Sequence, residues 1–496
     1  MSSTSHLQHD NINININARF SLPIFTTLLS RFDVLFFRYH SKHLIPRPNP
    51  NATYPYLHRS PHKHKHQMQL KDISVKLPHK PTATLRISAL FPGTSSPEFA
   101  DPLDITSLPP SSTLLVFLNG LILPRSSWNE CISRFLRIRD KQRRCASSSN
   151  SSVSSSDTAS GPKDESGTGN ANKHGSIPKS NNTSNDGTHV HVPSEIKIPN
   201  ILTYDRFGQG ESDRDPSDPD PEIDNTPYGH SPLDVIADLH QLLLLISQYL
   251  SQDLSSLNLV FIANSIGCPL ARLFNHHHSQ VRVTGYLFLD SMMANSDFIS
   301  VFPDPDSPEF DPEKDLRQGV SEEDLRWTRQ KFREKFHPSV GNAERLDRRG
   351  LRTLLPWADR PKLTIPPLRD GEEEEEDKNL NGKEKQEQEQ EQEQAGMREG
   401  TITRPKAIVI GHDWDVFADQ NEKGPMSIPK AVINGYMNPA WQRYNEGLTR
   451  LAAVDGNDDK DVVPVKIAKD CGHFIQKDDP ELVARELDYV LRGLGL

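Results

Sequence analysis

The segment from Asn258 to Pro269 carries the residue best placed to act as a nucleophile. It is an apolar, partly β-branched run that ends at Ser265, with Ala263 and Gly267 two positions away on either side. A serine exposed at a sharp strand-to-helix turn needs small residues at these two positions, because strand and helix approach closely there. The pattern therefore predicts a nucleophile elbow at Ser265. A strand followed by a serine helix cap is the alternative that the same residues permit.

An acid and a histidine follow later in the chain, each after a segment that is typical of a buried strand. Residues 406–411 form a short apolar run that leads into Asp413, and residues 463–468 are mostly apolar and lead into His473. The order serine, acid, histidine is the chain order of one known hydrolase architecture. We therefore expect a catalytic triad in which His473 takes the proton of Ser265 and Asp413 orients the histidine ring.

These motifs resemble the α/β-hydrolase superfamily, in its lid-bearing branch related to esterases, haloperoxidase-like enzymes and epoxide hydrolases. Gly472-His473-Phe474, with its acidic and proline continuation, is similar to the histidine loop of that branch, and residues 204–212 are similar to its D-x-x-G-x-G-x-S turn. Residues 114–120 occupy the place of its strand and His-Gly pair, with Asn119 instead of the histidine. Asn119 would either add a side-chain donor or hold this loop.

The resemblance covers residues 70–300 and 400–496 and implies an α/β fold, with a mostly parallel eight-stranded sheet, helices on both faces and an inserted helical cap. The residue pattern agrees, because apolar runs alternate with helical segments. A serine cap followed by proline predicts a helix from Ser231 to Leu250. Strands are expected at residues 72–77, 84–91, 113–118, 200–204, 257–263, 283–289, 406–410 and 463–468.

Low-complexity segments divide the chain. Residues 1–69 are expected to be an N-terminal extension without stable structure, and residues 70–297 the first part of the hydrolase core. This part carries a Ser-, Asn- and Gly-rich insert at 144–190, which is too polar to join a core. Residues 298–405 are expected to form the cap, with an acidic low-complexity tract at 370–399, and residues 406–496 complete the core.

The residues that assist the triad are less firmly defined. The acid has two alternatives to Asp413. One is Asp415, because the family's commoner spacing puts the acid three residues past Gly411, where this chain has Trp414. The other is Asp290, because some members take the acid from the preceding strand. A tetrahedral intermediate places negative charge on the former carbonyl oxygen, which backbone N–H groups must stabilise. The N–H groups of Ile266 and Leu121 occupy the expected positions of this oxyanion hole.

The expected activity is cleavage of an ester-type bond, a carboxylester or a thioester, through an acyl-enzyme. A serine nucleophile argues against epoxide hydrolysis and dehalogenation, which require an ester to a carboxylate. An acyltransferase with the same triad is one alternative, and an inactive binding protein on the hydrolase fold is another. We expect no cofactor and no metal, since His276, His277 and His278 point in different directions around a helix.

Charge and cysteine usage restrict the partners and the compartment. The acidic tract holds 13 acidic and 4 basic residues, a net charge of −9 against −10 for the whole chain. The remainder is nearly neutral, so we expect a small-molecule acyl or ester substrate and no nucleic acid. The four cysteines have no framework spacing, which favours the cytoplasm. A mitochondrial location is the alternative, because residues 18–43 are arginine-bearing and poor in acids. No apolar run reaches transmembrane length.

Overall fold

A computed structural model of the protein describes residues 69–92, 111–150, 197–220, 222–367, 404–453 and 462–496. The predicted N-terminal extension, most of the 144–190 insert and the acidic tract lie outside the described residues. The first residues of the predicted insert, 144–150, belong to helix α2 (Asn129–Asn150). The regular structure therefore continues a few residues beyond the predicted boundary.

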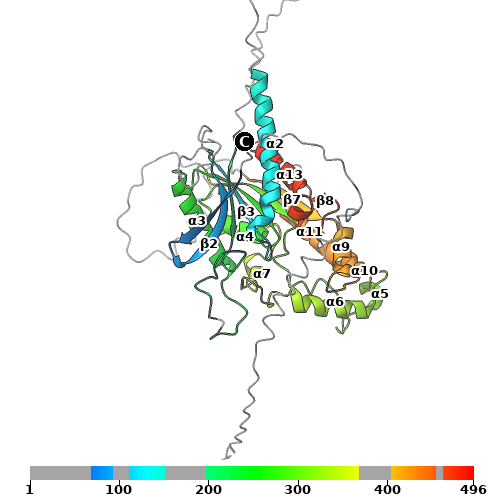
Figure 1. Cartoon of the computed structure of the whole chain (residues 1–496). Helices are drawn as coiled ribbons and strands as arrows, with labels where there is room; N and C mark the ends of the chain where they lie inside the picture. The colour runs from blue at the N-terminus through cyan, green and yellow to red at the C-terminus, as the bar shows by residue number, and fades with distance from the viewer. Residues whose placement is uncertain (1–68, 93–110, 151–196, 221, 368–403, 454–461) are drawn as a thin grey trace, which may run out of the picture. The chain divides into compact units, whose positions relative to one another are not determined.

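One eight-stranded sheet forms the centre of the described chain (Figure 1), in the order β1-β2-β4-β3-β5-β6-β7-β8. Strand β2 pairs antiparallel with β1 and β4, and the other neighbours are parallel. This is the mostly parallel sheet that the sequence predicts. Its strands are β1 (Lys71–Leu77), β2 (Lys80–Leu90), β3 (Thr113–Leu118), β4 (Asn200–Asp205), β5 (Asn258–Asn264), β6 (Val283–Leu289), β7 (Lys406–His412) and β8 (Lys466–Ala468).

The central strands are buried on both faces, so their side chains alternate between two hydrophobic cores. In β5, Leu259, Phe261 and Ala263 join one core, while Val260 and Ile262 join the other. The first core includes α3 (Pro232–Tyr249) and α4 (Gly267–His277), and the second includes α2 and α13 (Pro480–Gly493). Helices therefore cover both faces of the sheet, and α2 lies beside α13 (Figure 1).

Helix starts follow the caps that the sequence indicates. Ser231 and Asp234 form a reciprocal capping box at α3, with Pro232 in the first turn. Ser321 and Asp324 form the same motif at α6 (Glu322–Lys335). Each box satisfies backbone N–H groups that the first helical turn leaves without partners, which fixes where the helix begins.

The segment between β6 and β7 contains α5 (Pro312–Asp315), α6 and α7 (Leu351–Leu354), and it corresponds to the expected cap. A second helical excursion, which the sequence did not predict, separates β7 from β8. It consists of α9 (Trp414–Lys423), α10 (Lys430–Val432), the π-helical turn η4 (Ile433–Met437), α11 (Asn438–Thr449) and the 3₁₀ turn η5 (Arg450–Ala452). Its helix α11 contacts β7 and so reaches the sheet edge where the predicted catalytic residues lie.

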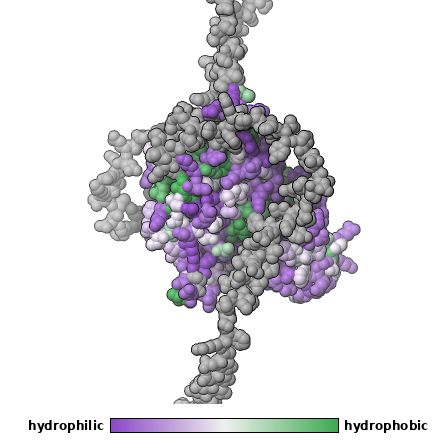
Figure 2. Space-filling model, viewed as in Figure 1, coloured by the Kyte–Doolittle hydropathy of each residue, from purple (hydrophilic) through white to green (hydrophobic). Residues whose placement is uncertain are grey.

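The described surface is mostly hydrophilic on the face that Figure 2 shows, with small and scattered hydrophobic areas. The most exposed large apolar side chains, Ile223 and Trp357, belong to different segments of the chain. Single exposed apolar residues of this kind are normal for a globular surface. Within the described residues, no helix has both the length and the apolar character needed to cross a membrane.

Candidate active site

Ser265 lies at the turn between β5 and α4, in the conformation that a nucleophile elbow requires. Its φ is 55°, a left-handed value that is strained for a residue with a side chain. Two backbone hydrogen bonds fix it: the Ser265 N–H donates to the Leu289 carbonyl over 3.2 Å, and the Met292 N–H donates to the Ser265 carbonyl over 3.1 Å. Ile266, not Ser265, occupies the N-cap position of α4. The alternative of a serine helix cap therefore does not describe this turn.

Gly267, two residues after Ser265, has the steric role that its position predicts. A Cβ at Gly267 would lie 2.5 Å from the carbonyl oxygen of Leu118 in β3, closer than a side chain can approach. Ala263 is fully buried in the core. The sequence motif thus reflects close packing of α4 against the neighbouring strand.

Asp290 and His473 are in direct contact next to the elbow. Asp290 follows β6, the strand next to β5, and is completely buried with a φ of 43°. Its Oδ2 lies 2.6 Å from Nδ1 of His473, in the loop after β8. The Asn264 amide, adjacent to Ser265, donates to the backbone carbonyls of Leu289 over 3.0 Å and of His473 over 3.2 Å. These bonds tie the acid and histidine loops to the elbow.

The position of Asp413 corrects the expectation that it orients His473. Asp413 is the N-cap of α9, and its carboxylate accepts from the N–H groups of Asp415 over 3.0 Å and Val416 over 3.4 Å. Its second oxygen accepts from the Asp470 N–H over 3.1 Å. Its carboxylate is thus used to cap a helix and to hold a loop, the role in which aspartate commonly serves at turns.

Asp415, the second candidate acid, lies in the first turn of α9 and is exposed. One of its oxygens is 3.1 Å from Nζ of Lys430. An exposed carboxylate paired with a lysine cannot orient a histidine ring on another loop. Of the three candidates, Asp290 is the one that the structure brings to His473.

Asp290 also contacts a second histidine, His412, which was not among the predicted site residues. Nδ1 of His412, the last residue of β7, lies 2.9 Å from each Asp290 oxygen. Burial alone would raise the pKa of Asp290, but His412 and His473 outweigh it and hold the pKa well below its usual range. Asp290 is therefore ionised throughout the neutral range. His412 could have been found from the sequence, because it follows a predicted strand and directly precedes Asp413, the expected acid.

Asn119 holds the loop opposite the elbow. Its Nδ2 donates to the Tyr204 carbonyl over 2.9 Å, and its Oδ1 accepts from Nε1 of Trp128 over 2.7 Å. The side chain is therefore used structurally, which is one of the two roles anticipated for it. The next residue approaches the elbow directly, because a Cβ at Gly120 would lie 3.3 Å from Cβ of Ser265. The assignment of the Ile266 and Leu121 N–H groups to an oxyanion hole stays a prediction.

A buried ion pair between Arg206 and Glu344 also holds the loop of Asn119 and Gly120. Arg206 donates to the backbone carbonyls of Asn119 over 2.8 Å and Gly120 over 3.0 Å. Its guanidinium also pairs with both oxygens of Glu344, each at 2.9 Å. Glu344 belongs to the segment between β6 and β7, so this pair links the loop beside Ser265 to the expected cap. A planar, bidentate guanidinium suits such a connection.

Helix α11 completes the surroundings of His473, and no sequence motif indicates this contribution. The Trp441 ring lies 5.4 Å from the His473 ring, in an edge-to-face arrangement. Its Nε1 donates to the Ser291 carbonyl over 2.8 Å, directly after Asp290. Trp441 is therefore held in place against the ring of His473.

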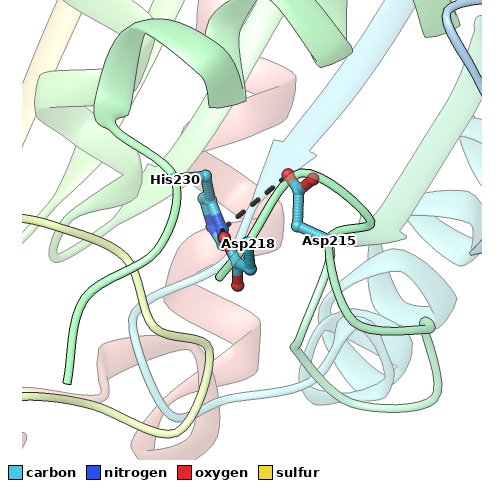
Figure 3. Close-up of side chains that lie close together, drawn as sticks. All are labelled: Asp215, Asp218 and His230. Carbon is cyan, nitrogen blue, oxygen red and sulfur yellow. Dashed lines mark hydrogen bonds and ion pairs between the residues drawn. The ribbon is translucent and has the colours of Figure 1, made fainter. Parts of the chain in front are cut away.

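One group among the described residues has the composition of a metal site. Ligand atoms of Asp215, Asp218 and His230 lie within 4.8 Å of one another (Figure 3). However, Nζ of Lys80 lies 2.6 Å from Asp215. Two further cations, Arg214 and Arg345, each place Nε 3.8 Å from Asp218. These positive groups already compensate the carboxylates, so the arrangement fits an ion-pair network better than a divalent cation.

A cavity of about 640 Å³ opens between the 300–317 segment and the η4–α11 region. Its wall is mixed in charge, with Asp304, Glu309, Arg317 and Arg443, and the triad candidates do not line it. This cavity is therefore not the space in which Ser265, Asp290 or His473 would contact a substrate.

A search of the curated proteins found no match. Among solved structures, an epoxide hydrolase mutant from Vigna radiata is 10% identical, with a TM-score of 0.37, over 86% of this chain and 99% of that one. The epoxide hydrolase VrEH1 from Vigna radiata is 11% identical, with a TM-score of 0.34 over the same shares. A membrane phospholipase A, described as a bacterial virulence factor, is 13% identical, with a TM-score of 0.32 over 86% of this chain and 87% of that one.

The model of the alpha/beta hydrolase family matches residues 189–486. This span includes the elbow serine, both histidines that contact Asp290, and the helical excursion between β7 and β8. Because the match extends over more than half of the sequence, the chain belongs to the alpha/beta hydrolase family.

Proposed function

We propose that the protein is a serine hydrolase that cleaves an ester-type bond through Ser265, His473 and Asp290. Membership of the family supports hydrolysis in general. One observation carries the finer assignment: the 2.6 Å contact between Asp290 and His473. The loop of His473 is in turn bonded to Asn264, the residue that precedes the strained Ser265. A nucleophile, a base and an orienting acid are the groups that acyl transfer through a covalent intermediate requires.

The reaction follows from these roles. His473 Nε2 accepts the hydroxyl proton as Ser265 Oγ bonds to the carbonyl carbon of the substrate, and the carbonyl oxygen takes the negative charge. The C–O or C–S bond then breaks, and the leaving group takes the proton from His473. Water then bonds to the acyl carbon as His473 takes one of its protons, the bond from that carbon to Ser265 Oγ breaks, and His473 returns the proton to Oγ as the acid is released. Asp290 holds the Nδ1 proton of His473 and stabilises the cation that forms in each step.

The residue at the elbow limits the substrate class. Epoxide opening in this architecture requires a carboxylate nucleophile, which leaves an ester that water can hydrolyse. Ser265 would leave an ether, which has no carbonyl for water to attack. Ester-type substrates are therefore favoured. None of the four cysteines, which all lie among the described residues, forms a disulfide, and this favours the reducing cytoplasm as the compartment.

The test is covalent labelling together with ester hydrolysis. Ser265→Ala should abolish labelling by a fluorophosphonate and hydrolysis of short p-nitrophenyl esters, with little change in melting temperature. Ser247→Ala is the matched control, because Ser247 is also buried but lies in α3. Equal labelling of the Ser265→Ala variant and the unmodified protein would refute the assignment.

A further inference from the structure

His412 makes contacts with both of its ring nitrogens. Nδ1 lies 2.9 Å from each oxygen of Asp290, and Nε2 lies 3.0 Å from Oδ1 of Asn438. Asn438 is the first residue of α11, directly after the π-helical turn η4. The residue thus bridges the triad acid and a helix that also contacts His473 through Trp441.

The hydrogen-bond network assigns the protons on the ring. Nδ1 faces an ionised carboxylate, which can only accept. The amide of Asn438 is oriented by its Nδ2, which donates over 3.1 Å to the Trp414 carbonyl, and a carbonyl oxygen can only accept. Oδ1 of Asn438 must therefore face Nε2 of His412 as an acceptor. Both ring nitrogens donate, so His412 carries two protons and a positive charge.

The surroundings of His412 make this charge unusual. Its side chain is 3% exposed and packs against the rings of Phe417 and Trp441, with centroids 4.3 and 5.5 Å away. The titratable groups that face it are Asp290 after β6, Asp413 at the start of α9 and, across Asp290, His473. Burial would lower the pKa of His412, but Asp290 and the hydrogen bond to Asn438 outweigh burial and raise it.

We propose that His412 is a positioning residue that stays an imidazolium through the neutral pH range and shares the carboxylate of Asp290 with His473. This inference rests on the proposed function, because it concerns the base of that triad. His473 must be neutral to take a proton from Ser265. A carboxylate that faced His473 alone would stabilise its protonated form, which cannot act as a base. A permanent cation on the other side of Asp290 opposes that effect and keeps the base available at lower pH.

The size of the effect follows from the shared oxygen. Nδ1 of His412 and Nδ1 of His473 lie 2.9 and 2.6 Å from the same Oδ2, so they are at most 5.5 Å apart. One positive charge at this distance, with an effective dielectric constant of roughly 20 to 40, moves a proton equilibrium by about one to two pH units. This is the shift that removal of the charge should reveal.

The charge of His412 can be observed without any substrate. In protein labelled with ¹⁵N-histidine, the His412 resonances are identified as those missing from the His412→Gln variant. Both ring nitrogens should show imidazolium shifts and attached protons from pH 6 to pH 8. A neutral tautomer of His412 at pH 7 would overturn the proposal, whether or not the protein proves to be an esterase.

The functional consequence is tested by the pH dependence of kcat/KM with a p-nitrophenyl ester. His412→Gln keeps a hydrogen-bond donor for Asp290 but removes the charge, so the acidic limb should move up by about one to two pH units. Asn438→Leu removes the acceptor at Nε2 and should move the limb in the same direction. His230→Gln is the matched control, since His230 is buried and contacts Asp218 at 3.1 Å outside the site.

The outcomes separate the two proposals. An unchanged acidic limb in an active His412→Gln variant would show that the residue is merely structural and would overturn the inference. If Ser265→Ala retained full activity, the proposed function would fail, while the resonances of His412 would still decide its charge. If His412→Gln did not fold, the pH profile of Asn438→Leu would decide, and an acidic limb unchanged in that variant would overturn the inference.

Discussion

The sharpest prediction contrasts two aspartates, Asp290 and Asp413, that each follow a parallel strand of the same sheet. Asp290→Asn should remove most of the activity, and Asp413→Asn should leave it nearly intact. The reason is geometric: Asp290 contacts Nδ1 of His473, whereas Asp413 accepts backbone N–H groups at the start of α9. Asparagine is as good a helix cap as aspartate, so the second exchange also preserves stability.

The magnitude can be worked from the contact. His473 becomes a cation when it takes the serine proton, and Asp290 is in direct contact with it at 2.6 Å. At an effective dielectric constant of about 20, opposite unit charges roughly 4 Å apart interact by about 4 kcal/mol. Since 1.36 kcal/mol is a factor of ten in rate, loss of this interaction lowers kcat about 10³-fold. Loss of the correct ring tautomer extends the range to about 10⁴-fold, with KM little altered.

The assay is steady-state hydrolysis of p-nitrophenyl acetate at a fixed pH near 8, with melting temperatures recorded for both variants. Asp413→Ala is included to measure the cap itself, which should lower stability by about 1 kcal/mol without a kinetic effect. If Asp413→Asn lost 10³-fold or more in kcat while Asp290→Asn remained active, the acid would be assigned wrongly and the contact at His473 would be incidental. A loss in neither variant would remove the acid from the mechanism.

Three further predictions concern the support of the site. Gly267→Ala should destabilise the protein by about 1–3 kcal/mol in chemical denaturation, because its Cβ would overlap the Leu118 carbonyl; an unchanged midpoint would contradict the packing at the elbow. Arg206→Met should lower stability by about 3–5 kcal/mol, because Glu344 is left buried and unpaired. A second exchange in the same protein, Glu344→Gln, should recover part of the loss. No recovery would argue against the ion pair. Because the pKa of His412 is raised, its stabilising contribution is complete below about pH 6.5 and is lost as the pH rises through the raised value. The difference in unfolding free energy between the unmodified protein and His412→Gln should therefore shrink at alkaline pH. A constant difference from pH 6 to 10 would refute this linkage.

A deletion tests the division of the chain. Removal of residues 372–394 or of residues 147–185 should leave hydrolysis of a small activated ester intact, since neither segment has the apolar side chains to join a core. Halving a long loop changes its closure entropy by only about 0.6 kcal/mol. A folded but inactive deletion variant, judged by circular dichroism and the ester assay, would mean that the segment shapes the site.

The fold was predictable because each core strand has a local signature. Strands such as β3, β5 and β6 are apolar runs that are buried on both faces, and α3 and α6 begin at capping boxes that can be read directly from the residues. The elbow could be predicted equally well, since Gly267 is small for a steric reason that depends on the local turn. The helical excursion between β7 and β8 was not predicted, because α11 is recognised by what it packs against rather than by a motif.

The identity of the acid depends on distances between segments that are far apart in the sequence. Asp290 and Asp413 both follow strands whose carboxyl ends meet at one edge of the sheet, so spacing alone leaves both within reach of a histidine loop. What separates them is the use of their oxygens. Asp413 finds three backbone donors nearby and caps α9, whereas Asp290 is enclosed, with His412 and His473 as its side-chain partners. A buried carboxylate is stable only with such partners. Because both histidines contact Asp290, its negative charge interacts with both rings. In the mechanism that we propose, the strength of the base therefore depends on three residues, Asp290, His412 and His473. The order of residues along the chain indicates only the two of them that belong to the triad.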